Sequence, residues 1–552
     1  IWATPTPGPL ASILTLDTPA ATRAYWASVA LVVGSLFVTR LLPCVDYPQH
    51  LALSDIARRL GDRAAPEHAE YWLNYFTYNG LFHIVVAKLG AILPIELAGR
   101  LVVGASLAAM AAAVVALVKT LRRPALHAAL FTPILFSFSV GWGFVNYVLA
   151  TTIAAWTLVF VARSAIRPTL GRCAAVAVLG LLCAVAHVLA MMILCITAAV
   201  LALEIGWRAA PASTASSRGA RLRRAFVRAV FAAGPLLIGS VYCIAVYRME
   251  YAWNPTMYRD PTMEGSAPPL WEKVTWFGAF ATELFRDASD QVILWTAIAV
   301  MAFSVFFAWR GRKGRPARPG GDVAPPVVGP FVALTAAYFA TPMVLVGTHL
   351  IFPRLAQWAV LGAVLAMPPF PPEVAPRARR WMVGLTLATG INVLAHCFLF
   401  SWETNDASRV IDDLPPGGAA TAVVWQPGTM AFRNGMLTHL AAYYAARKHG
   451  EWAFAFARYL SVPVRFKDHA QPAWPARGWE FDASAYDPRC KYARAFPLVI
   501  VRAPPGLPRD ASGEPRVRKL VFGRDADAVR LLSHHGRFWA FDTAGLPDDG
   551  TF

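Results

Sequence analysis

The residues best suited to chemistry lie in the short segment Asp46-Tyr-Pro-Gln-His50, which directly follows the first apolar run, residues 24–42. A carboxylate can remove a proton from an incoming nucleophile, and a histidine can hold an anion or share a proton. An acid just past the end of a membrane helix stands where a water-soluble reactant can meet a lipid-borne one. Asp46 is therefore the candidate catalytic residue, and His50 is a candidate substrate-binding residue.

Two other interpretations of these residues stay open. Asp46 could form a cap or an Asx turn before the helix that Pro48 opens, and this role is compatible with catalysis. Asp46 and His50 could also be ligands of a divalent cation, although two residues do not complete a metal site. The sequence points to no other cofactor.

The composition is that of a multi-pass membrane protein. Apolar residues make up 57% of the 552 residues and charged residues 15%, whereas a soluble domain is about half apolar and about a quarter charged. The apolar runs recur at about the 20-residue length that a bilayer core requires. The net charge of +18 is carried mostly between these runs, and no basic helix stands apart from them, which argues against nucleic acid as a partner.

The positions of Lys and Arg predict the topology, because these residues stay on the cytoplasmic side. The basic clusters are Lys119–Arg123, Arg163–Arg172, Arg208–Arg228, Arg310–Arg315 and Arg377–Arg380. If all are cytoplasmic, the chain crosses the membrane about 11 times, with the N-terminus inside and the C-terminal segment outside. The predicted spans are 24–42, 99–119, 125–140, 144–162, 173–187, 189–206, 229–247, 291–309, 329–348, 355–370 and 381–400. Residues 173–206 could instead form one long helix, without a break near His187.

Three regions share the outer side in this topology, namely loop 43–98, loop 248–290 and the chain after residue 402. In the first loop the apolar residues follow helical spacing while the charged residues fill the other face, which predicts an interfacial amphipathic helix. The apolar residues are Leu53, Ile56, Ala57 and Leu60, and the charged ones are Asp55, Arg58, Arg59 and Asp62. The short apolar segment 80–95 is expected to dock as a helix at the outer surface.

The composition changes after Trp402. Residues 1–402 are expected to form the transmembrane domain, and residues 403–552 a soluble extracytoplasmic α/β domain large enough to bury its own core. Strands are expected at Ala420–Trp425, Leu498–Val501 and Phe538–Phe541, and helices at Met436–Lys448 and Asp525–Leu532.

Three ordered motifs in the first loop resemble a known family. They are Asp46-x-x-x-His50-x-x-x-x-Asp-Ile-Ala-Arg-Arg-Leu60-Gly, Tyr78-Asn-Gly-Leu-Phe-His83-Ile-Val-Val-Ala-Lys-Leu-Gly90, and Ile95-Glu-Leu-Ala-Gly-Arg100-Leu. This order resembles the first outer loop of GT-C fold glycosyltransferases, with the nearest likeness to lipid A aminoarabinose transferases and protein O-mannosyltransferases. The motifs cover residues 24–120, and the remainder is similar in architecture.

The chain departs from that family's pattern at two places. Tyr47 stands where a second acid is common, and Asn79-Gly80 stands where the family has a Pro-Pro pair preceded by a Lys. The family's phosphate-binding Lys therefore has no counterpart at that position.

The resemblance implies a GT-C glycosyltransferase of the bacterial inner membrane. Such an enzyme moves a sugar from a polyprenyl phosphate or pyrophosphate to a lipid, glycan or protein acceptor at the outer face. Asp46 matches the family's catalytic position and would act as the base. Cations must offset the charge on the departing lipid phosphate. His50 and His83 are candidates to contact the donor phosphate or the acceptor, although His83 could equally be a surface histidine on an interfacial helix.

A later loop, Thr348-His349-Leu-Ile-Phe-Pro-Arg354, adds two candidate binding residues, His349 and Arg354. An arginine on the outer side is unusual under the positive-inside rule, and its guanidinium fork suits phosphate oxygens. It could equally anchor the chain to lipid headgroups. His187 is interpreted as a polar break between two spans rather than a ligand.

A non-catalytic or transport protein of polysaccharide or lipid assembly, such as a flippase, is the alternative function. Transporters usually place ionisable groups at mid-membrane, but the predicted spans hold almost none and polar groups gather at their outer ends. No internal repeat is visible, which disfavours inverted-repeat transporters. A receptor or sensor would leave the Asp46 segment unexplained. The sequence therefore favours surface chemistry.

Overall fold

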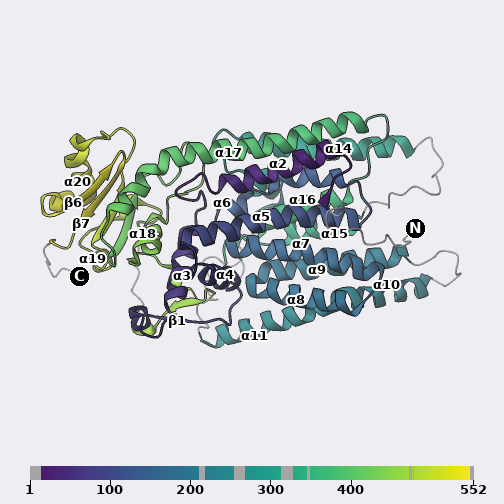
Figure 1. Cartoon of the computed structure of the whole chain (residues 1–552), viewed down its shortest axis with the longest axis horizontal. Coiled ribbons are helices and arrows are strands. Elements are labelled where there is room, and N and C mark those ends of the chain that lie inside the picture. Colours follow the sequence, from purple (N-terminus) through teal and green to yellow (C-terminus); the bar gives the residue numbers. More distant parts are fainter. Residues whose placement is uncertain are drawn as a thin grey trace.

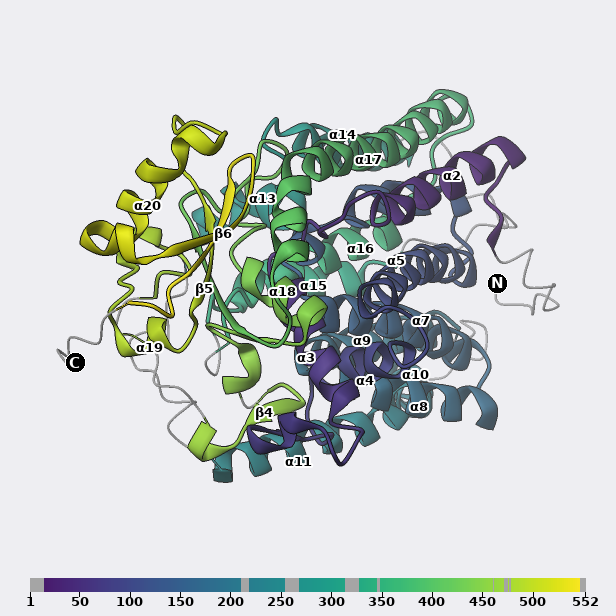
Figure 2. The ribbon, with the colours of Figure 1, turned by 60° about the vertical axis from the view of Figure 1, so that its left-hand side comes forward.

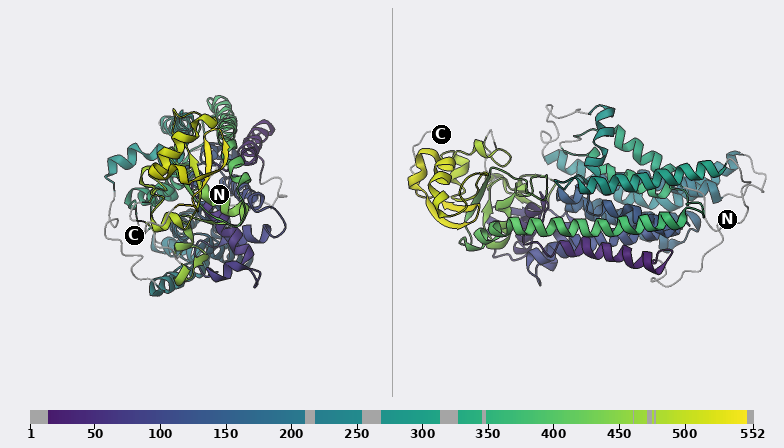
Figure 3. Two further views of the ribbon diagram at one scale, coloured as in Figure 1. Left: turned by 90° about the vertical axis from the view of Figure 1, so that its left-hand side faces the viewer. Right: turned by 90° about the horizontal axis from the view of Figure 1, so that it is seen from above.

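The computed structural model describes residues 14–209, 218–253, 268–312, 327–344, 348–459, 461–470, 475 and 478–546. The molecule is elongated, with a bundle of roughly aligned helices and a β-sheet at one end of the bundle (Figure 1). An end-on view shows the sheet covering that end, and a view from above shows α17 (Ala375–Asp413) running along the bundle to reach it (Figure 3). We call this the sheet end of the bundle.

The bundle consists of helices that carry mostly apolar side chains. They are α2 (Pro19–Ser35), α5 (Ile95–Thr120), α7 (Val145–Ile166), α8 (Leu170–Ala186), α9 (Val188–Ala209), α10 (Arg218–Ala233), α11 (Leu237–Trp253), α14 (Ser289–Arg312), α15 (Gly329–Ala340), α16 (Ala356–Ala366) and α17. The 3-10 helix η2 (Ala125–Ile134) and the short α6 (Phe138–Gly141) complete it. Among the described residues, 6 helical stretches are long and apolar enough to cross a membrane, and 4 shorter apolar helices accompany them. The chain is a multi-pass membrane protein.

Helices occur in all the predicted spans, with differences at their ends. The segment 173–206 forms two helices, α8 and α9, because His187 between them is extended, with φ −168° and ψ 123°. The predicted span 329–348 is too long, since α15 ends at Ala340 and Thr341 is extended. Residues 125–140 begin as the 3-10 helix η2 with Pro133 inside it, and a proline lacks the N–H that a regular α-helix would use.

The first loop forms α3 (Tyr47–Arg59), the 3-10 helix η1 (Pro66–Ala69), β1 (Tyr71–Leu73) and α4 (Leu81–Leu89). Helix α3 differs from the predicted interfacial helix, because most of its residues are buried, including the charged Asp55. The carboxylate of Asp55 pairs with Arg58 at 2.7 Å, with Arg59 at 3.0 Å and with His449 of the C-terminal segment at 3.0 Å. The C-terminal segment therefore covers Asp55, which was expected to meet water, while Asp62 at the end of the predicted helix remains exposed.

The sheet at the end of the bundle is mixed. Its strands are β2 (Ala419–Val424), β3 (Glu451–Trp452), β5 (Leu498–Arg502), β6 (Arg530–His535) and β7 (Phe538–Asp542), in the order β3-β2-β5-β7-β6. Strand β2 is parallel to β3 and β5, and β7 is antiparallel to β5 and β6. Alternate side chains of a strand point to opposite faces. Accordingly Ile500 joins the core shared with the bundle, whereas Val499 and Val501 join a separate core on the other face.

Several short elements surround this sheet. They are α18 (Leu440–Lys448), α19 (Lys491–Arg494), α20 (Glu514–Phe522), β4 (Val464–Phe466) and the 3-10 helices η5 (Phe456–Arg458), η6 (Asp468–Ala470), η7 (Ala483–Ala485), η8 (Ala511–Gly513) and η9 (Gly523–Ala528). The predicted helix Asp525–Leu532 is wrong, because its second half belongs to β6, where Leu531 pairs with Phe541 of β7.

The membrane part and the C-terminal part are joined closely. Helix α17 continues through position 402, the predicted domain boundary, and ends at Asp413. Strand β1 of the first loop pairs with β4 of the C-terminal segment, with Tyr71 opposite Phe466. Helices α3 and α18 lie side by side between the bundle and the sheet (Figures 1 and 2).

The loop predicted at 248–290 is partly helical. It contains the end of α11, then α12 (Leu270–Thr275) and α13 (Phe277–Thr282). Asp260 and Glu264, two acids of this loop, lie outside the described residues. Glu250 is fully buried and pairs with Arg465 at 3.0 Å, so it is a structural ion pair between α11 and β4.

Candidate functional site

The backbone of Asp46 is fixed at the sheet end of the bundle. The N–H groups of Val45 and Asp46 donate to the carbonyls of Gly141 and Trp142, each at 2.9 Å. Gly143 follows with φ +78°, a conformation that L side chains rarely adopt, and a Cβ there would stand 2.7 Å from the Asp46 nitrogen. The turn between α6 and α7 therefore holds Asp46 through a position that requires glycine.

The side chain of Asp46 does not cap α3. It occupies the N-cap position, but it makes no side-chain capping hydrogen bond. Its Oδ1 instead accepts from Nε2 of His439 at 3.2 Å. The Asp46 side chain is 16% exposed. The carboxylate is thus held for an interaction other than helix capping, and part of it remains accessible.

His439 lies just before α18 and contacts two carboxylates. Besides Asp46, its Nδ1 lies 2.6 Å from Oε1 of Glu480. Burial by itself would lower the pKa of His439, but Glu480 and Asp46 outweigh it and raise that pKa to about 10. His439 is therefore an imidazolium at neutral pH.

Next to this group, α3 and α4 bring together two neutral histidines. Nδ1 of His50 lies 3.2 Å from Nε2 of His83, and Nδ1 of His83 lies 3.2 Å from Oγ of Ser54. Burial is the largest effect on the pKa of His50 and lowers it. The charge of Asp46 raises this pKa, those of His439 and Arg354 lower it, and the net pKa is about 4. His83 is fully buried, so it is not the surface histidine of the alternative interpretation. An uncharged imidazole can donate a hydrogen bond to a substrate or accept one from it.

Arg354 approaches the same group from the loop before α16. It is 7% exposed, and its guanidinium lies over the ring of Phe144 at 3.8 Å. One terminal nitrogen lies 3.1 Å from Nε2 of His187, and the other donates to the carbonyl of His349 at 3.2 Å. Its Nε is buried and makes no hydrogen bond to any described residue. Such burial does not fit a lipid-headgroup anchor, and the guanidinium retains a free donor.

The structure brings some of the predicted residues together and leaves one apart. Asp46 and Arg354 both act electrostatically on His50, which in turn contacts His83. The side chain of His349 is exposed, and only its carbonyl takes part, through Arg354. Over the described ranges, no group of three or more His, Cys, Asp or Glu side chains is arranged to hold a metal ion.

Sequence reasoning missed His439, Glu480 and the role of His187. Asp46 and His439 are 393 positions apart, so no local spacing links them. His187 was recognised as a break between helices, and the same break lets its ring reach Arg354. In the sequence, His439 is simply a histidine within the predicted helix Met436–Lys448. A histidine in that setting does not by itself indicate a functional site.

Comparison with known proteins supports the architecture. No protein-family model and no curated protein sequence matches the chain. Its structure is similar to that of ArnT from Cupriavidus metallidurans bound to undecaprenyl phosphate, with 12% sequence identity and a TM-score of 0.51 over 96% of this chain and 98% of that one. The apo state of the same ArnT gives 13% identity and a TM-score of 0.48 over 94% and 97% of the two chains.

The similarity to the undecaprenyl-phosphate complex extends over nearly the whole length of both chains, which includes the bundle and the sheet. Motifs in the first loop had pointed to the same architecture from the sequence. The chain therefore has the GT-C fold, the fold of the lipid A aminoarabinose transferase ArnT.

Proposed function

We propose that this protein is a glycosyltransferase that moves a sugar from a polyprenyl-phosphate donor to an acceptor at the outer face of the membrane. The observation that carries the proposal is that a partly accessible carboxylate, Asp46, and a buried guanidinium, Arg354, both act electrostatically on the neutral His50 at one end of a membrane bundle. The ArnT of the same fold was crystallised with undecaprenyl phosphate.

The chemistry assigns a separate role to each group. The acceptor hydroxyl or amine attacks the anomeric carbon of the sugar, and Asp46 takes the proton that the acceptor loses. The bond between the anomeric carbon and the phosphate oxygen breaks, and the lipid phosphate leaves with the electron pair. Arg354 stabilises the developing negative charge, because a guanidinium offers several donors to phosphate oxygens in a shielded site.

The neighbouring imidazoles assist this arrangement. His187 lies against the guanidinium of Arg354 at 3.1 Å and fixes its orientation. His50 can offer Nε2 to a sugar hydroxyl or to phosphate without adding charge. Both ring nitrogens of the fully buried His83 face protein partners, so we assign it the role of orienting the His50 ring. We assign His349 a supporting role through its backbone carbonyl, which accepts from Arg354.

The orientation follows from the basic clusters. Arg163 lies in the last turn of α7, and Arg172 at the start of α8 donates to its carbonyl at 3.1 Å. Asn146, at the other end of α7, lies 3.5 Å from His83. Because basic loops stay in the cytoplasm, the sheet end faces outward. In the bacterial inner membrane, the N-terminus is then cytoplasmic and residues 403–552 are extracytoplasmic, where they can meet a lipid, glycan or protein acceptor.

The test uses the full chain in lipid nanodiscs, with undecaprenyl phosphate as the binding probe and a panel of polyprenyl-phosphate sugars as donors. Asp46→Asn is expected to bind undecaprenyl phosphate normally and to lose transfer by about 100-fold or more. Asp62→Asn, an exposed acid of the same loop, is the matched control and should keep full activity.

Normal transfer by Asp46→Asn would reject Asp46 as the base. A wild-type protein that moves labelled undecaprenyl phosphate between leaflets without releasing any sugar would reject glycosyl transfer and would identify a flippase.

A further inference from the structure

The C-terminal segment contributes a side chain to the centre of the candidate site. His439 stands directly before α18, yet its Nε2 lies 3.2 Å from Oδ1 of Asp46 in the first loop. Its other nitrogen, Nδ1, lies 2.6 Å from Oε1 of Glu480, which comes from a later part of the same segment. The side chains of His439 and Glu480 are 3% and 10% exposed, so this array of two carboxylates and one imidazole is shielded from water.

The hydrogen-bond pattern requires a proton on both ring nitrogens. Carboxylates are acceptors, so each nitrogen that faces one must donate. Nε2 of Gln49 also lies 3.2 Å from Nδ1, but it donates to the carbonyl of Phe454 at 3.0 Å. The Gln49 Oε1 accepts from Trp452 at 2.7 Å, which fixes the orientation of this amide. Gln49 therefore offers no acceptor to Nδ1, and Glu480 is the group that Nδ1–H meets.

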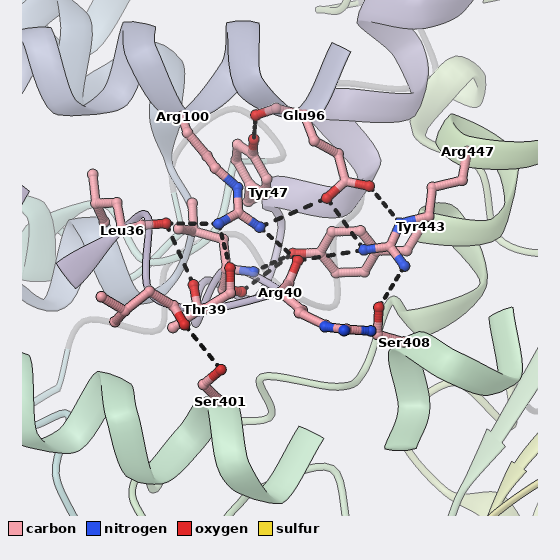
Figure 4. Close-up of polar contacts among 12 residues, drawn as sticks. Leu36, Thr39, Arg40, Tyr47, Glu96, Arg100, Ser401, Ser408, Tyr443 and Arg447 are labelled. Atoms are coloured by element: carbon pink, nitrogen blue, oxygen red, sulfur yellow. Dashed lines mark hydrogen bonds and ion pairs between the residues drawn. The ribbon is translucent and has the colours of Figure 1, made fainter. Parts of the chain in front are cut away.

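The far end of α18 is anchored to the membrane bundle. Arg447 donates to Oε2 of Glu96 at 3.2 Å and to Oγ of Ser408 at 2.7 Å, and Arg100 lies 3.6 Å from the same Glu96 (Figure 4). In the middle of the helix, the hydroxyl of Tyr443 accepts from the backbone N–H of Leu42 at 2.8 Å. Contacts from the segment after α2, from α5 and from α17 thus hold α18 and set the position of the histidine at its start.

We propose that His439 is a positioning residue for Asp46: its imidazolium holds one carboxylate oxygen, so that the other oxygen faces the acceptor, and Glu480 keeps the ring protonated. This inference rests on the proposed glycosyl transfer and deepens it, because it makes the C-terminal segment part of the reaction centre. Asp46 remains the base, and the ring exchanges no proton with the substrate.

The charged and titratable groups around His439 predict a specific pH dependence. Asp46 and Glu480 face its ring. His50 is under the electrostatic influence of Asp46 and His439, and Tyr459 under that of Glu480, Arg458 and Asp46. With Glu480 in place, the pKa of His439 is about 10, so the ring keeps its charge across the neutral range. Glu480→Gln removes the negative charge beside Nδ1 while keeping an amide oxygen that can accept from it, and this lowers the pKa of His439, so the ring should lose its charge at a lower pH.

The activity test compares Glu480→Gln and His439→Gln with His535→Gln, a surface histidine on β6 that pairs with Asp413. Glu480→Gln should lower kcat by about 10-fold or more and leave the donor KM within about twofold. In its pH profile, kcat should fall on the alkaline side at a lower pH than in the wild type, where this fall comes only near pH 10. His439→Gln should lower kcat without that fall, and His535→Gln should behave as wild type. Wild-type kcat and an unchanged pH profile in Glu480→Gln would overturn the proposal.

A spectroscopic test separates this inference from the proposed function. Solid-state NMR of the full chain with ¹⁵N-labelled histidine, compared with His439→Gln, identifies the His439 ring resonances. They should show two protonated nitrogens at pH 7.5 in the wild type, and one in Glu480→Gln. A neutral His439 in the wild type rejects the array even if transfer is found. A charged His439 in a protein that transfers no sugar rejects the proposed function alone.

Discussion

At the scale of single residues, burial and neighbouring charges decide which histidines of the site carry a proton. His439 keeps its proton because two carboxylates face it, and His50 loses its own because burial dominates. Arg354 remains the cation available to a phosphate, with a buried Nε that no described residue satisfies. A buried donor without an acceptor is unfavourable, so an anionic ligand that accepts from it gains affinity.

The buried Nε of Arg354, unsatisfied by any described residue, predicts the effect of Arg354→Lys. The substitution keeps the charge but loses the planar fork and the stacking on Phe144. We expect the donor KM and the dissociation constant for undecaprenyl phosphate to rise by about 10-fold or more, with a smaller change in kcat. Arg409→Lys, on the exposed surface of α17, serves as the control. Unaltered binding of undecaprenyl phosphate would argue against a phosphate role for Arg354.

At the scale of elements, the turn between α6 and α7 supports Asp46, the proposed base. It contacts the backbone on both sides of Asp46, and it allows no side chain at Gly143 because a Cβ would stand 2.6 Å from the Tyr47 nitrogen and 2.7 Å from the Asp46 nitrogen. Any residue other than glycine must therefore displace the start of α3, and with it the carboxylate.

Gly143→Ala tests this role against Gly417→Ala. Both glycines have positive φ, +78° and +74°, but a Cβ at Gly417 meets nothing within 4 Å. Both variants should lose about 1–2 kcal/mol of stability from the backbone conformation. Only Gly143→Ala should also lower kcat, by about 100-fold, because small displacements of a catalytic group are costly. Melting temperature and turnover measure the two effects, and equal turnover of the two variants would contradict the prediction.

At the scale of the whole molecule, the histidines of the site link stability to pH. The pKa of His50 falls from 6.5 to about 4 on folding, so the unfolded chain binds a proton in this range and the native protein does not. Stability is therefore lost as the pH falls from 6.5 to 4, by up to about 3 kcal/mol. The pKa of His439 rises to about 10, so its contribution is full below pH 6.5 and is lost as the pH rises through 10.

The expected result is a stability maximum whose acid side depends on His50. In nanodiscs, His50→Gln should flatten the fall of the apparent melting temperature between pH 6.5 and pH 4. Glu480→Gln should lower the melting temperature more at pH 6.5 than at pH 10, where the contribution of His439 is being lost in the wild type as well. His535→Gln should leave both limbs in place. An acid limb that is equally steep in His50→Gln would show that other groups cause it.

The sequence by itself determined the membrane class and the location of most helices, and it proposed the first loop as the candidate site. Apolar runs of bilayer length and basic clusters are local signals, because each span satisfies its own backbone hydrogen bonds. The same holds for strands such as Leu498–Val501, whose apolar run remains visible in β5. Asp46 could be proposed because its neighbours in sequence form a recognisable motif.

Only the tertiary structure decided which groups surround that carboxylate. His439 and Glu480 come from 393 or more positions away, and Arg354 meets His187 across 167 positions. The burial of Asp55, which looked like a solvent-facing residue of an amphipathic helix, also depends on a distant partner, His449. The burial and the pKa of a side chain at a site depend on all the segments that pack against it. The spacing of residues along one segment gives information only about that segment.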